Sequence, residues 1–101
     1  MDEQDRVAAF VDRHGIDEPP AYRALDLASE VGEVAKEVTE SSDYGASPDD
    51  VEIAGDELGD ALFALLALCE SVDVDAGAAL EAALAKYEAR LEETGSPASG
   101  E

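Results

Sequence analysis

The sequence has little cysteine, few basic residues and no long apolar run. Its single cysteine, Cys69, cannot form a disulfide within the chain, and its apolar neighbours predict a buried thiol. The longest apolar run, residues 61–69, is too short to span a bilayer, and the first residues, MDEQDR, lack the pattern of a secretory signal peptide. We therefore expect a cytoplasmic protein.

The shortage of basic residues leaves the charge of the chain very uneven. There are 26 acidic residues against 6 basic ones, for a formal net charge of −20 at pH 7. Long-range repulsion of this size excludes binding to a nucleic acid backbone by general electrostatics. A phosphate ligand must therefore arrive with a cation or meet a local basic pocket. Most of the acids are expected to form a solvated surface of the halophilic kind, which needs high salt to suppress self-repulsion.

The residue types that are plentiful favour a single all-α domain. Hydrophobic residues make up 46% of the 101 residues, much of this as alanine, which favours helix. No stretch alternates with a period of two, so no sheet is expected. A chain this short buries only a modest core, which pairing with a second copy would enlarge. We expect a four-helix bundle-like domain over residues 1–93, completed by dimerisation, and a disordered tail over 94–101.

Apolar spacing and local start signals place four helices along the chain. They are expected at about residues 2–13, 21–40, 47–72 and 73–93. Ser47 is the expected cap of the third helix, because Pro48 follows it and an acid, Asp50, lies three residues after it. Asp73 or Asp75 is the expected cap of the fourth.

Acidic residues interrupt the apolar faces of the second and third expected helices. With each residue turned about 100° around the axis, Glu30, Glu33 and Glu37 fall within about 60° of one another, beside an apolar stripe. On the third expected helix, Glu57 and Asp60 lie on the same side as apolar residues. The stretch that begins one turn later is apolar on every face. An unpaired buried carboxylate is costly or takes up a proton, and few cations are available to pair with it. A divalent metal ion would explain these acids.

The spacing of the acids supports a shared metal site. Glu30 and Glu33, and likewise Glu57 and Asp60, are i, i+3 pairs, and each pair lies on one face of its helix. If the two helices pack antiparallel, the four carboxylates meet. A site of oxygen ligands without histidine or cysteine favours Mg²⁺, for which Mn²⁺ can substitute, over Zn²⁺. The alternative is that these acids belong to the solvated surface.

At these residues the sequence resembles the MazG-like nucleotide pyrophosphohydrolases of the all-α NTP pyrophosphatase superfamily. That family carries E-x-x-E followed by E-x-x-D, here within SEVGEVAKEV and DELGDALFALLAL. The resemblance covers about residues 21–90. It implies Mg²⁺-dependent cleavage of a nucleoside triphosphate between the α and β phosphates, which releases a monophosphate and pyrophosphate. It also implies a dimer or a dimer of dimers, and a housecleaning role against non-standard nucleotides.

The resemblance also suggests roles for individual residues. Glu57 and Asp60 are the expected inner metal ligands, and Glu30 and Glu33 are further ligands that activate or orient water. Glu37 is a further candidate for the metal set. The sequence departs from many relatives at Ser29, where an acid is common, and at Leu84, two residues before Lys86, where an asparagine is common.

Basic residues that could hold phosphate are few. Lys86 and Arg90, an i, i+4 pair on the fourth helix, are the expected phosphate clamp; their alternative role is ion pairing with neighbouring glutamates. Arg23 and Lys36 are weaker candidates. Two other functions stay open: a non-catalytic acidic helical module that binds a partner protein, and a phosphoribosyl-ATP pyrophosphatase, whose flanking pattern is not evident.

Overall fold

The computed structural model describes residues 1–97, and over this range the chain is helical, with no strand. The elements are α1 (Asp2–His14), α2 (Pro20–Ser41), the 3₁₀ helix η1 (Pro48–Asp50), α3 (Gly55–Ser71) and α4 (Ala76–Thr94). The all-α class and the four helices expected from the sequence are confirmed. The expected disordered tail begins at Thr94, which is the last residue of α4, and its residues 98–101 lie outside the described range.

The third α-helix begins later than the sequence predicts. Ser47 makes no capping hydrogen bond with its side chain, and only one 3₁₀ turn follows it. Residues 51–54 then continue without helix until α3 begins at Gly55. The reason is tertiary: side chains of α2 accept hydrogen bonds from the backbone of residues 52 and 54, so these N–H groups cannot enter a helix. The local start signal was correct for a single turn only.

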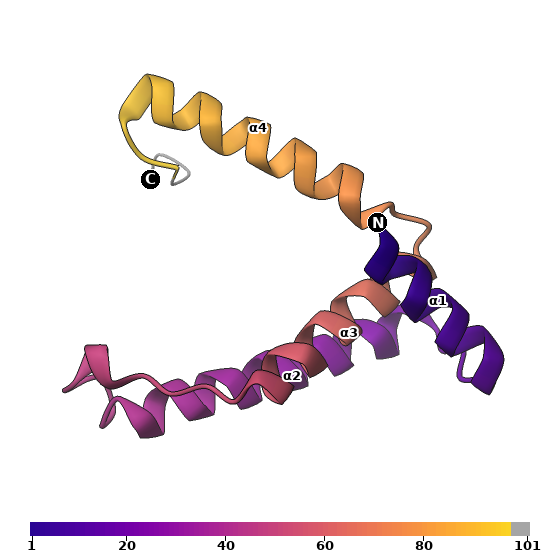
Figure 1. The fold of residues 1–101 in the computed structure, drawn as a ribbon, viewed down its shortest axis with the longest axis horizontal. Coiled ribbons are helices and arrows are strands. Elements are labelled where there is room, and N and C mark those ends of the chain that lie inside the picture. Colours follow the sequence, from indigo (N-terminus) through magenta and orange to yellow (C-terminus); the bar gives the residue numbers. More distant parts are fainter. Residues whose placement is uncertain (98–101) are drawn as a thin grey trace.

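Helices α2 and α3 form an antiparallel pair, and α1 packs against α3 (Figure 1). In the described range the buried apolar residues, Ala64, Leu66 and Ala67, all lie on α3. Phe10 of α1 meets Phe63 of α3 edge-to-face, with ring centroids 5.9 Å apart. The core is therefore small and centred on the helix that the sequence predicts to be wrapped by others.

Helix α4 leads away from the α2–α3 pair, so the four helices do not close into a bundle within one chain (Figure 1). Its apolar stripe is 40–50% exposed and consists of Leu80, Leu84, Tyr87 and Leu91. On α3, three leucines are similarly exposed: Leu58, Leu62 and Leu65. Completion of the bundle by a second copy remains a prediction.

The start of α4 is fixed by a buried amide. The Gln4 side chain of α1 donates to the Val74 carbonyl and accepts from the Ala76 N–H, each at 2.7 Å. Asp75 caps the helix by accepting from the Ala78 N–H, as one of the two sequence alternatives predicts. The direction in which α4 leaves is therefore set by hydrogen bonds.

Two smaller expectations can also be compared with the structure. No helix of the described chain combines the length and apolarity that a membrane crossing requires. Cys69 is a free thiol, but it is half-buried rather than buried, because the face of α3 that carries it is only partly covered.

Candidate metal centre

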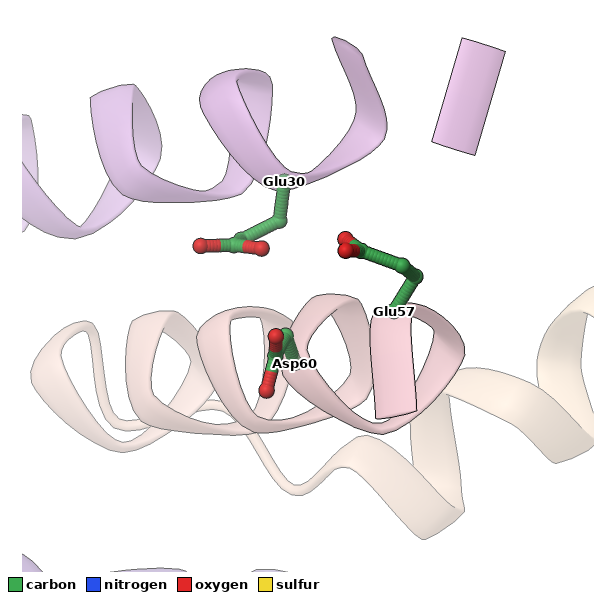
Figure 2. A group of neighbouring side chains, drawn as sticks. All are labelled: Glu30, Glu57 and Asp60. Carbon is green, nitrogen blue, oxygen red and sulfur yellow. The ribbon is translucent and has the colours of Figure 1, made fainter. Parts of the chain in front are cut away.

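Three acidic side chains meet between α2 and α3. Glu30 reaches from α2 toward α3, and Glu57 and Asp60 come from the facing side of α3 (Figure 2). One carboxylate oxygen of each lies within 4.8 Å of the other two. We call these three residues the acidic trio. Glu30 and Glu57 are half-buried and Asp60 is exposed, so the trio opens to solvent on one side.

The donor set of the acidic trio fits a hard divalent cation. Oxygens on opposite sides of a Mg²⁺ are about 4.2 Å apart, so small side-chain rotations would bring all three into its coordination sphere. Carboxylate oxygens without nitrogen or sulfur ligands favour Mg²⁺ or Mn²⁺. The open side leaves room for water or phosphate oxygens, which Mg²⁺ commonly retains.

The electrostatics of Glu57 reflect the crowding of carboxylates around it. Partial burial raises the pKa of Glu57, and nearby carboxylates raise it further; in order of effect they are Glu37, Asp56, Glu33 and Asp60. These neighbours come from both helices. A bound cation would remove the repulsion that raises this pKa.

The other two glutamates expected at the site lie beside the trio, not within it. Glu33 is exposed on α2, one turn after Glu30, and is near enough to affect the pKa of Glu57. Glu37 is half-buried, and its Oε2 accepts a 2.8 Å hydrogen bond from the Ala54 N–H. Of the five acids named from the sequence, the structure therefore gathers three closely.

The expected phosphate clamp lies elsewhere in the chain. Lys86 and Arg90 are on α4, which leads away from α2 and α3 (Figure 1). The Lys86 ammonium lies 5.0 Å from the centre of the Tyr87 ring, and Arg90 donates to the Pro97 carbonyl at 3.3 Å. Within a single chain, neither residue is brought to the acidic trio.

Arg23 is the basic residue that the structure places beside the trio. It lines a cavity of about 210 Å³ together with Asp26, Glu30, Asp60 and Phe63. Its side chain is only 5% exposed, and one guanidinium nitrogen donates to the Ile16 carbonyl at 2.5 Å. The sequence signal was weak: Arg23 lies seven residues before Glu30, and two helical turns put both on one face.

The comparison with protein families identifies the domain. The family model described as MazG nucleotide pyrophosphohydrolase domain matches residues 20–94, from the first residue of α2 to the last residue of α4. The chain belongs to the MazG family. Searches of curated proteins and of solved structures found no match.

The MazG match contains every part of the candidate site and confirms the resemblance found in the two acidic motifs. The acidic trio, Glu33 and Glu37 lie on the matched helices α2 and α3, and only α1 lies outside the match. Three carboxylates this close would repel a polyphosphate. A triphosphate can therefore approach this MazG domain only together with cations that neutralise both sides.

Proposed function

We propose that this MazG domain hydrolyses nucleoside or deoxynucleoside triphosphates between the α and β phosphates, with Mg²⁺ as its natural cofactor and Mn²⁺ as a substitute. The products would be a nucleoside monophosphate and pyrophosphate. The observation that best supports the proposal is the convergence of Glu30, Glu57 and Asp60 within 4.8 Å, inside the segment matched by the family.

The positions of the acids suggest which of them bind the cation and which accepts a proton. Glu57 and Asp60, with Glu30 facing them, would hold the cation, which would neutralise the triphosphate and make its α-phosphorus more electrophilic. Glu33 stands outside the trio but next to it, so one of its oxygens is free to accept a proton from the attacking water. Glu30 is the alternative base, because it also reaches the site from α2.

Contacts to the phosphates can come from Arg23 or from a second copy. Arg23 already lines the cavity beside Glu30 and Asp60. Lys86 and Arg90 could reach a triphosphate only if the α4 of one chain lies against the site of another. We propose a homodimer or a dimer of dimers of this kind, because it would also cover the exposed apolar stripes of α3 and α4.

The proposed reaction is tested with a panel of standard and non-standard nucleotides, incubated with Mg²⁺ in molar KCl and scored separately for pyrophosphate and orthophosphate. Pyrophosphate with monophosphate is expected, and preference for a non-standard nucleotide would support a housecleaning role. Asp60→Ala should lower the rate by about 100-fold or more, since it removes a ligand that stabilises charge in the transition state. Helix content by circular dichroism should stay unchanged.

The results that contradict the proposal are equally specific. Orthophosphate as the only product, or full activity in Asp60→Ala, would overturn it. Exposed apolar residues on α4 favour one other function, a helical module that binds a partner protein. That module would release no pyrophosphate from any triphosphate, and Mg²⁺ would not raise its melting temperature.

A further inference from the structure

The segment that leads into α3 is fastened to α2 at two points. The Glu52 N–H donates to Ser41 Oγ at 2.9 Å, and the Ala54 N–H donates to Glu37 Oε2 at 2.8 Å. Alternate N–H groups of an extended chain are about 6.6 Å apart, and residues four apart on a helix rise by about 6 Å. The spacing of the two acceptors therefore matches the spacing of the two donors.

The bond to Glu37 supplies what the start of α3 lacks. Ala54 is the residue that precedes the helix, and as an alanine it offers no side-chain oxygen to cap it. In a capping box, the acid three residues after the cap turns back to bind the N–H of the cap residue. At α3 that acid is Glu57. Here Glu37 occupies the Ala54 N–H instead, and Glu57 extends toward Glu30 (Figure 2).

We propose that Glu37 is a positioning residue, which binds the Ala54 N–H from α2 and thereby leaves Glu57 free to complete the acidic trio. The proposal rests on the proposed function, in which the trio holds the metal ion. It gives Glu37 a role different from that of a metal ligand, which its spacing from Glu30 suggested. Its charge also lies at the N-terminus of α3, where the helix dipole favours an anion.

The same bond fixes the register of the two helices. Because the pair is antiparallel, going back along α2 from Glu37 to Glu33 and Glu30 corresponds to going forward along α3 from Ala54. That direction leads to Glu57 and Asp60. Both acidic motifs therefore face each other. A slip of one turn would move Glu57 and Asp60 about 5.4 Å along α2 and disperse the trio.

The test measures Mn²⁺ binding to the full chain in molar KCl, from the electron paramagnetic resonance signal of free Mn²⁺. Glu37→Ala should weaken binding by about 10-fold or more, as loss of a group that orients metal ligands does. Glu37→Gln should bind within about threefold of wild type, because its amide oxygen still accepts the Ala54 N–H and the lost charge is partly screened. Glu40→Ala, which removes an exposed charge from the same helix, is the matched control.

A second readout follows the hydrogen bond itself. Amide hydrogen exchange at Ala54 should be slow in wild type and Glu37→Gln and faster in Glu37→Ala. Glu37→Met, which keeps the side-chain length, takes the place of the alanine variant if that variant loses helix content.

Three outcomes would overturn the proposal. Equal loss of Mn²⁺ affinity in the glutamine and alanine variants would make Glu37 a ligand through its charge. Wild-type affinity in Glu37→Ala would deny it any role at the site. A wild-type chain that binds no Mn²⁺ would remove the proposed metal site and, with it, the position that Glu37 is proposed to hold.

Discussion

At the level of single residues, the charges that the proposed metal site needs reduce the stability of the fold. Partial burial and the neighbouring carboxylates raise the pKa of Glu57 above its ordinary value. Ionising such a group costs the folded state free energy. That cost is fully present above the raised pKa, and it disappears as the pH falls from there to the ordinary pKa of a glutamate.

Glu57→Gln should therefore melt at a higher temperature than wild type at pH 7 in the presence of EDTA. The advantage should shrink as the pH is lowered through the raised pKa of Glu57, because the wild-type carboxyl then takes up a proton. Added Mg²⁺ should raise the melting temperature of wild type and not that of the variant. Thermal melts by circular dichroism measure both effects, with the exposed Glu40→Gln as the charge control.

Residue spacing alone could predict that Glu30, Glu57 and Asp60 lie near one another, because i, i+3 pairs on two helices need only the correct helices and an antiparallel packing. It also placed Glu33 among them, and the structure leaves Glu33 beside the trio. It could not predict the bond between Glu37 and Ala54. That bond depends on residues 51–54 being extended, and the sequence signal at Ser47 and Pro48 favours helix there. The sequence makes Arg23 only a weak candidate for a similar reason, because its burial depends on the path of the chain around Ile16.

At the level of elements, the structure depends on how each helix begins. Gln4 holds the chain between α3 and α4 through both ends of its amide, although the sequence gives no sign that a glutamine in an acidic first turn is buried. The Asp75 cap, by contrast, could be predicted, since a cap is local. Nearby residues predict the Asp75 cap but not the start of α3, where contacts with α2 override the signal at Ser47. The direction of a helix is set by partners far along the chain.

Replacing Gln4 should loosen α4 selectively. Gln4→Ala removes both hydrogen bonds, to Val74 and to Ala76, and should cost about 1–3 kcal/mol of stability. Gln4→Glu keeps the acceptor for the Ala76 N–H but puts a buried carboxylate against the Val74 carbonyl, so at neutral pH it should cost at least as much as Gln4→Ala. Urea unfolding measures the cost, and amide exchange of Ala76 measures the loosening. Equal stability of all three proteins would mean that the amide does not hold α4.

At the scale of the whole molecule, charge and uncovered apolar surface oppose each other. A net charge of −20 makes two copies repel, and molar salt weakens this repulsion. Uncovered leucines on α3 and α4 favour association, because covering them removes apolar surface from water. That the fold needs high salt, as the halophilic composition suggests, remains a prediction. Association between copies should likewise increase with salt.

We expect wild type to be at least a dimer in molar KCl and to shift toward monomer as KCl is lowered. Leu84→Glu should yield monomer even at high salt, because it puts a charge into the apolar stripe of α4, where Leu84 is 50% exposed. Ala82→Glu adds the same charge on the opposite side of α4 and should leave the dimer intact. Light scattering after size-exclusion chromatography measures the mass of each.

Activity of the monomer then separates the two sources of phosphate contacts. If Lys86 and Arg90 act from a neighbouring chain, Leu84→Glu should lose pyrophosphate release together with the dimer, although its acidic trio is intact. A monomer that keeps full activity would exclude contacts from a second copy. Arg23, which lies beside Glu30 and Asp60 in the same chain, would then be the cation that meets the triphosphate.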